Sequence, residues 1–192
     1  MAKKIAFIIT VFVLVFSLTM SVGCTLAYLV ATTDEVTNTF LPQNIDIELE
    51  ETTGTTYLMI PGVQWAKDPK VTVDNDIDCY AFVVIDVQNN VWNNGSSDIT
   101  AIEWAVASGW TLVSGTTNVY YREVAKDAAI KEFSVLNGDA VTVSAELTKA
   151  YMDAVEAGTI QKPTLTFAAY ATQKQNGNSV FSAAEAWNIA KP

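Results

Sequence analysis

Three aspartates at alternate positions, Asp74, Asp76 and Asp78, form the side-chain cluster in this sequence that best suits a metal ion. Their spacing matches the D-x-D-x-D opening of a calcium loop, because hard carboxylate oxygens suit that cation. An EF-hand would also need glycine at its sixth position and glutamate at its twelfth, where this chain has Cys79 and Ile85. The cluster is therefore a weak calcium candidate, and a solvated turn between two strands is the favoured interpretation.

The chain contains no histidine. This excludes the H-E-x-x-H zinc site, the Ser-His-Asp triad and the Cys-His dyad. Segment 52–55, Thr-Thr-Gly-Thr, is similar to the D-T-G turn of aspartic proteases, but threonine replaces the catalytic aspartate and there is no second copy. Such enzymes need two carboxylates that share a proton. We therefore predict that the protein is not an enzyme, with no catalytic residues and no cofactor.

Residues 1–27 have the features of an export signal. Two lysines precede an apolar stretch from residue 5 to residue 22, and Thr25 and Ala27 then place small residues at an A-x-A-like cleavage site. Cleavage by a signal peptidase would make Tyr28 the first residue of the mature chain. Two alternatives stay open. The stretch is long enough to act as an uncleaved membrane anchor, or Cys24 carries a lipid as in a lipoprotein.

The acidic balance of the chain argues against a nucleic-acid partner. Its net charge is −10 at pH 7, and removal of residues 1–27 removes two lysines and no acidic residue. Phosphate binding depends on clustered lysine and arginine side chains, whereas a strongly acidic surface suits a soluble exported protein. The mature chain would contain a single cysteine, Cys79, inside an apolar run, which predicts a buried side chain rather than a reactive thiol.

Alternation of apolar and polar residues dominates the rest of the chain and predicts β-strands. Segment 79–85 is apolar throughout and should lie in the middle of a sheet whose two faces are covered. Asn137 and Gly138 predict a hairpin turn, because both residues tolerate a positive φ angle. A loop is predicted at 89–98. The other predicted strands are 45–49, 57–60, 71–73, 99–106, 110–113, 118–124, 132–136, 140–145 and 164–172.

Two short helices are predicted among these strands. Apolar residues between 147 and 154 recur at i, i+3, i+4 and i+7, and Gly158 is placed to end the helix. Ser182 and Glu185 form an S-x-x-E capping box for the second helix. The pattern as a whole predicts an all-β fold, a jelly-roll-like β-sandwich with two short helices, preceded by a signal peptide.

The chain is rich in tryptophan, whose ring can stack on a sugar. In a sandwich of this size, however, tryptophans more often pack in the core and at its rim. Packing is therefore the favoured interpretation, with carbohydrate binding as the alternative. The five residues are Trp65, Trp92, Trp104, Trp110 and Trp187.

The predicted cleavage site is similar to a known kind of signal. Gly-Cys-Thr-Leu-Ala-Tyr-Leu at 23–29, with Thr-Thr-Asp at 32–34 and Asn-Thr-Phe at 38–40, resembles the signal peptides cut by SipW-type signal peptidases. The strand at 44–49 and the Lys-Val-Thr-Val-Asp-Asn segment at 70–75 resemble the TasA and camelysin family of exported Gram-positive proteins. The resemblance implies a jelly-roll fold and, as in several members, a role in biofilm matrix fibres. Camelysin relatives carry a metallopeptidase label, which does not fit a chain without histidine.

Residues 28–41 form the predicted N-terminal arm, and residues 42–192 the predicted sandwich domain. On an extended strand, Tyr28, Val30, Val36 and Phe40 share one face. Such a strand can add main-chain hydrogen bonds to an exposed sheet edge while its apolar side chains fill pockets. The resemblance likewise implies that this segment completes the sheet of a neighbouring molecule. The alternatives are a disordered terminus or an ordinary first strand of the chain's own sheet.

These observations predict an exported structural subunit of an extracellular matrix fibre or surface filament, assembled by donor-strand addition of the arm. The partners would be copies of the same chain in a head-to-tail filament, and a signal peptidase during export. No nucleic acid is expected, and membrane contact would be limited to the signal peptide before cleavage. The alternative function is a monomeric secreted or surface module that binds carbohydrate or another ligand.

Overall fold

The computed structural model describes residues 3–5, which have helical backbone, and residues 44–192. The chain divides into two units between Leu41 and Pro42, and residues 44–192 belong to the second. Within the described ranges, no helix combines the length and the apolar character needed to cross a bilayer. Most of the predicted signal peptide and the whole predicted arm lie outside the described residues. So do the site residues Thr25, Ala27, Tyr28, Val30, Val36 and Phe40.

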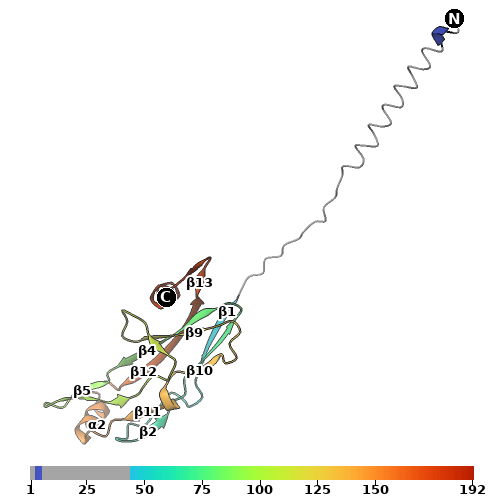
Figure 1. Cartoon of the computed structure of the whole chain (residues 1–192). Coiled ribbons are helices and arrows are strands. Elements are labelled where there is room, and N and C mark those ends of the chain that lie inside the picture. The colour runs from blue at the N-terminus through green and yellow to red at the C-terminus, as the bar shows by residue number, and fades with distance from the viewer. Residues whose placement is uncertain (1–2, 6–43) are drawn as a thin grey trace. The chain divides into compact units, whose positions relative to one another are not determined.

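The regular secondary structure of residues 44–192 is mainly β-strands in antiparallel sheets, as predicted (Figure 1). A four-stranded sheet has the order β12-β4-β9-β8, with bounds Thr164–Gln173, Cys79–Gln88, Val119–Val124 and Thr111–Leu112. A second sheet has the order β1-β3-β10, with bounds Ile45–Glu50, Lys70–Asn75 and Glu132–Ser134. A third has the order β2-β11-β7, with bounds Gln64–Ala66, Ala140–Val143 and Ile102–Glu103. Two hairpins pair β5 (Val91–Asn93) with β6 (Asp98–Thr100) and β13 (Gln175–Asn176) with β14 (Ser179–Val180).

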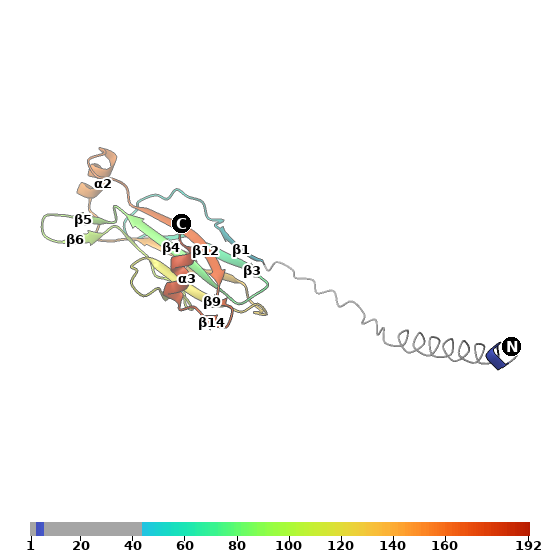
Figure 2. The same cartoon turned by 90° about the horizontal axis from the view of Figure 1, so that it is seen from above.

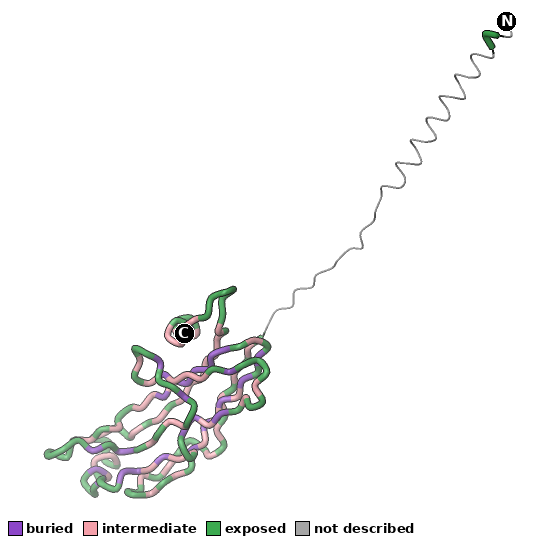
Figure 3. The backbone as a smooth tube through the Cα atoms, in the orientation of Figure 1, coloured by how far each residue is buried: buried purple, intermediate pink, exposed green. Residues whose placement is uncertain are grey.

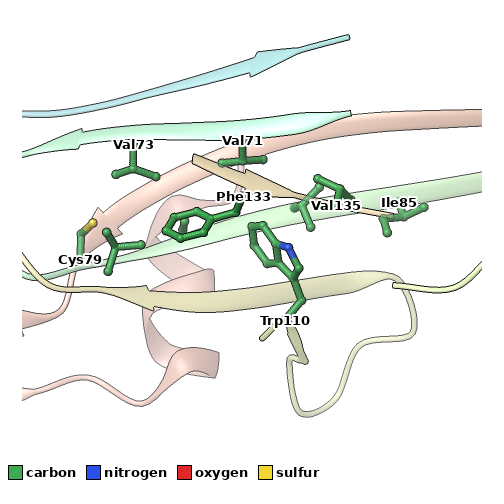
Figure 4. Close-up of a cluster of buried hydrophobic side chains, with 10 residues drawn as sticks. Val71, Val73, Cys79, Ile85, Trp110, Phe133 and Val135 are labelled. Atoms are coloured by element: carbon green, nitrogen blue, oxygen red, sulfur yellow. The ribbon is translucent and has the colours of Figure 1, made fainter. Parts of the chain in front are cut away.

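Strand β4 lies in the middle of its sheet with both faces covered, as its uninterrupted apolar sequence predicts. Ala81 and Val83 point into a core that they share with Val73 of β3, and Figure 4 shows this core between the facing sheets. On the other face, Phe82 packs against Trp187 with the ring centroids 5.4 Å apart. Figure 3 shows buried segments in several parts of the domain, alternating along the chain with intermediate and exposed ones.

Both predicted helices are present. Helix α2 (Lys149–Glu156) ends before Gly158, whose φ of 71° turns the chain away. Helix α3 (Ala183–Ala190) begins with the predicted capping box: the Ser182 hydroxyl accepts the Glu185 N–H, and the Glu185 carboxylate accepts the Ser182 N–H at 2.8 Å. Figure 2 shows α3 lying across the face of the four-stranded sheet, where it covers β4 and β12.

The hairpin predicted at Asn137-Gly138 is wrong. These residues form a short 3-10 helix, η1 (Asn137–Asp139), and the strands on either side belong to different sheets: β10 pairs with β3, and β11 pairs with β2 and β7. Gly138 has the expected positive φ of 68°, a backbone conformation that glycine adopts without steric cost. The chain nevertheless crosses between sheets, because the preceding Leu136 is fully buried in a cluster with Ile102 and Val141 of the third sheet.

Two other local predictions also need correction. Segment 57–60 is not a strand, because the Trp65 indole N–H donates to the Leu58 carbonyl at 2.8 Å and its apolar residues Leu58 and Ile60 are exposed. The loop predicted at 89–98 contains the β5-β6 hairpin. Asn93 and Asp98 face each other in this hairpin, and the Asn93 amide donates to the Asp98 carboxylate at 2.7 Å.

Cys79 is fully buried in the core, as predicted, and burial raises the pKa of its thiol to about 11. In a chain that begins at Tyr28, we expect no reaction with a thiol reagent at about pH 8 until denaturant is added, since the thiolate is the reactive species. Because the folded-state pKa lies above the ordinary value of 9.0, the free energy of unfolding should fall as the pH rises from 9.0 toward 11. Rapid labelling of the folded protein would contradict this placement.

Candidate functional site

A groove of about 420 Å³ opens beside the first half of β12. Its wall combines the segment before β2 with side chains of β7, β11 and β12, so it lies where the third sheet meets the four-stranded sheet. A second hollow of about 270 Å³ shares Thr55, Lys67, Leu165 and Thr166 with the groove and adds Phe167. Together these two hollows follow β12 from Thr164 to Phe167, and we call them the β12 groove.

The groove borders a free strand edge. Among residues 44–192, β12 pairs only with β4, and β1 pairs only with β3. Strands β1 and β12 approach each other at this side of the sandwich without forming a ladder. An edge strand presents a row of unpaired N–H and C=O groups, which is a template for pairing with another chain. The site thus offers main-chain hydrogen-bonding groups beside a largely apolar hollow.

An ion pair between buried Lys67 and half-buried Glu51 forms part of the wall. Lys67 follows directly after β2 and is only 7% exposed, and its ammonium group donates to the Glu51 carboxylate. The Lys67 nitrogen also lies 5.3 Å from the ring centre of Tyr57 and 5.6 Å from that of Phe167. Both rings thus hold the cation over their faces. The Tyr57 hydroxyl lies 3.2 Å from the Glu51 carboxylate and 2.7 Å from the Gly54 carbonyl, so its single proton can be donated to either acceptor.

The turn at 52–55 is similar in sequence to a protease turn, but here the Asp68 carboxylate holds it in place. The Asp68 carboxylate accepts hydrogen bonds from the backbone N–H groups of Thr52 and Thr53, both at 3.0 Å. It also accepts the hydroxyl groups of Thr52 and Thr53, at 2.6 and 2.8 Å. These four bonds hold the turn against the chain that follows β2. The Asp68 carboxylate is therefore an anchor for one rim of the groove.

This anchoring predicts a dependence on acid pH. The hydroxyl and backbone donors of Thr52 and Thr53 hold the pKa of Asp68 well below its ordinary range. An acidic group whose pKa is lower in the folded state than in the unfolded state stabilises the fold at pH values above the unfolded-state pKa. This contribution is lost as the pH falls from the unfolded-state pKa toward the folded-state pKa. The Tm advantage of the wild type over Asp68→Asn should therefore shrink between about pH 5 and pH 2. A constant difference, measured by thermal melts across this range, would contradict the assignment.

The three aspartates of the calcium candidate do not point to one place. Asp76 accepts the Asn44 N–H at 3.3 Å, and Asp78 accepts the Lys126 N–H at 2.9 Å. Asp74 is exposed on β3 opposite Asp46. In residues 3–5 and 44–192, no group of three or more aspartate, glutamate, cysteine or histidine side chains is arranged to hold a metal ion.

All five tryptophans pack in hydrophobic clusters, which confirms the packing interpretation. Trp110 is 8% exposed, and its indole N–H donates to the Ser134 carbonyl at 2.9 Å. Trp92 packs edge-on against Tyr151 with the ring centroids 5.4 Å apart. Trp65 alone lines the groove, and its N–H is already bonded to the Leu58 carbonyl.

Sequence reasoning missed Glu51, Lys67 and Asp68. Lysine and acidic residues near a strand end usually indicate a solvated surface, because such side chains are seldom buried. The signal that could have found Lys67 is its place between Trp65-Ala66 and Pro69, in a segment that turns into the core at Val71. Its partner Glu51 lies sixteen positions earlier, and no local pattern links the two.

The fold and the groove define a class: a mainly antiparallel β-sandwich protein with a free edge strand beside an apolar hollow. Comparisons of the chain with models of protein families, with curated proteins and with solved structures gave no match. The similarity to the TasA and camelysin family therefore stays a prediction, which depends on the quoted segments of the sequence.

Proposed function

We propose that this chain is an exported structural subunit of an extracellular matrix fibre or surface filament, with a sandwich of jelly-roll type. The signal peptide is removed during export, and the arm at 28–41 binds along the β12 groove of a neighbouring copy. The observation that carries the proposal is the free edge of β12 with an apolar hollow directly beside it. An added strand gains main-chain hydrogen bonds from the edge and buries its apolar side chains in the hollow.

The direction of β1 favours head-to-tail assembly. The arm precedes Asn44, which lies beside the Ile45 end of β1, whereas the groove borders Glu50 and Glu51 at the other end. At about 3.3 Å per residue, six residues of β1 separate these points by roughly 20 Å. An arm that leaves at one end of a domain and binds near the other end of the next makes a heterologous contact, which grows open filaments.

The arm also has a suitable length and a suitable face. Residues 28–41 span at most about 46 Å when extended, compared with about 33 Å for the ten residues of β12. The arm can therefore cover the whole edge. Its face with Val36 and Phe40 would contact apolar groove residues such as Ile102, Val141 and Leu165. The domain supplies its own core, since the hydrophobic clusters lie within residues 44–192.

Electron microscopy of two purified chains tests the proposal. The chain that begins at Tyr28 should form filaments on prolonged incubation, and the chain that begins at Pro42 should stay monomeric. Both should show the same circular dichroism and a similar Tm, because residues 44–192 contain the hydrophobic clusters of the described domain. Equal filament growth by the shorter chain would refute a role for the arm.

A matched pair of substitutions tests which edge is used. Thr166 lines the groove on β12, and Thr111 is exposed on β8 at the far edge of the same sheet. Charged lysines on an edge strand oppose pairing with another chain. We expect Thr166→Lys to abolish filaments of the chain from Tyr28 and Thr111→Lys to leave them intact. The reverse result would place the contact on β8.

A further inference from the structure

We propose that segment 54–60 is a second recognition element of the β12 groove, which pairs with the free side of a strand that β12 has bound. We call this segment the clasp. The inference rests on the proposed function, because the bound strand belongs to a neighbouring copy. It concerns the receiving domain alone and does not depend on which residues of the neighbour supply the strand. That strand would have a ladder of main-chain hydrogen bonds on each side.

The main chain of the clasp is free to pair. Among the described residues, no acceptor receives a backbone N–H from Gly54 through Met59, and the Ile60 N–H donates only to the Leu58 carbonyl inside the clasp, at 3.1 Å. Folded proteins pair nearly all the backbone N–H groups that they bury, so six consecutive free groups must bond to water. Such a row of donors is what an edge strand offers to another chain.

The sequence of the clasp favours a strand that the domain by itself does not form. Residues 55–60 are Thr-Thr-Tyr-Leu-Met-Ile, in which β-branched and aromatic residues of high strand preference predominate. The structure nevertheless has neither strand nor helix here. A conflict between local preference and observed structure is expected at functional sites. The partner that the clasp lacks within its own domain is an intermolecular strand.

The clasp and the free edge of β12 line the same groove. Thr55, Tyr57 and Met59 contribute to the lining from the clasp, and residues 164–166 contribute from β12. The second hollow likewise combines Thr55 with Leu165. Paired strands lie about 4.8 Å apart. A strand bound along β12 at this groove would therefore have the clasp beside it.

The side chains of the clasp already alternate as in an extended chain. Tyr57 and Met59 are half-buried and line the groove, whereas Leu58 and Ile60 are 65% and 44% exposed. Alternate residues of a strand point to opposite faces. The clasp can therefore pair without moving its groove-lining side chains to the other face.

Both ends of the clasp are fixed to the domain. The Asp68 carboxylate accepts the N–H groups of Thr52 and Thr53 before the clasp. After it, the Gly62 N–H donates to the Val143 carbonyl at 2.9 Å. A segment with fixed ends loses less conformational freedom when it pairs than a free chain does, which favours binding.

Amide hydrogen exchange, followed by mass spectrometry, tests the inference. Filaments of the chain from Tyr28 are compared with the monomeric chain from Pro42. Amides 54–59 should exchange rapidly in the monomer and about tenfold more slowly in filaments, because a paired amide exchanges only after local opening. Ser114 and Gly115, which follow β8 at the far edge of the four-stranded sheet, should exchange equally in both.

A matched pair of proline substitutions tests the contribution of the clasp to assembly. Thr56→Pro removes one donor of the clasp, and Thr117→Pro removes the free N–H of another exposed threonine, beyond β8. Loss of one hydrogen bond should raise the protein concentration needed for filaments by about twofold to tenfold in Thr56→Pro. Thr117→Pro should leave it unchanged. Circular dichroism and Tm of the two monomers show whether either substitution disturbs the fold, and the exchange measurement needs no substitution.

The outcomes separate this inference from the proposed function. Filaments whose amides 54–59 exchange as fast as those of the monomer would overturn the clasp and leave the proposed function standing. Slow exchange of these amides already in the chain from Pro42 would also overturn it, because the clasp would then pair within its own domain. Equal assembly by Thr56→Pro and Thr117→Pro would count against it in the same way. Absence of filaments from the chain that begins at Tyr28 would refute the proposed function, and the clasp with it.

Discussion

Replacing Phe82 with alanine is expected to lower the free energy of unfolding by about 3–5 kcal/mol. Phe82 is fully buried on the face of β4 that α3 covers, between the rings of Trp187 and Tyr80 at 5.4 and 6.0 Å. The substitution leaves a cavity under α3 and removes both aromatic contacts. Urea denaturation of the chain from Tyr28 measures the effect.

The control for this prediction is Leu112→Ala on β8, where the side chain is 45% exposed. A surface substitution of this kind should change stability by no more than about 0.5 kcal/mol. The loss of packing at Phe82 should also release α3, which limited proteolysis of the C-terminal segment would detect. If Phe82→Ala and Leu112→Ala cost the same, α3 does not form the cover of this sheet.

Removing one partner of the Lys67–Glu51 pair is expected to cost about 3 kcal/mol, whereas replacing both should cost less than either single change. Glu51→Leu leaves the Lys67 charge without its carboxylate in a site that is 9% exposed, and Lys67→Met leaves Glu51 with only the weaker neutral donors. The double variant has no charge left to bury, and methionine can keep contact with Tyr57 and Phe167. A double-mutant cycle by urea denaturation gives the coupling energy directly.

The control for the cycle is an exposed ion pair of good geometry. Lys149 and Asp153 lie four residues apart on α2 at 2.6 Å, with side chains that are 85% and 55% exposed. Solvent screens this pair, so its coupling should be no more than about 0.5 kcal/mol. Additive effects at Lys67 and Glu51 would mean that solvent screens this pair as it screens Lys149 and Asp153.

Much of the secondary structure follows from short patterns. The apolar run in β4 and the alternation in β1 and β12 indicate which residues face inward. The capping box of α3 indicates where that helix begins. The burial of Cys79 could likewise be predicted from the apolar residues around it in the sequence. These features depend on a few neighbouring residues, whose preferences are set by backbone geometry and by the cost of exposing apolar surface.

The arrangement of the strands could not be predicted in this way. Gly138 has the positive φ angle expected in a hairpin turn, but Asn137 does not, and the chain passes into another sheet. Leu136, just before this turn, is buried against distant residues of the third sheet. The groove likewise results from pairing between strands that are far apart in the sequence. β12 pairs with β4, far earlier in the chain, and this pairing leaves its other edge free.

The identity of the candidate site depended most on tertiary structure. Glu51 and Lys67 lie on different segments, and Phe167 reaches them from β12 a hundred residues later in the sequence. The sequence alone established that the chain is acidic and has no histidine-based chemistry, and its alternating pattern predicted a fold rich in β-strands. Only the folded domain brought a buried amine, a carboxylate and an open strand edge together, because a local pattern determines which face of a strand is apolar but not which distant strand it meets.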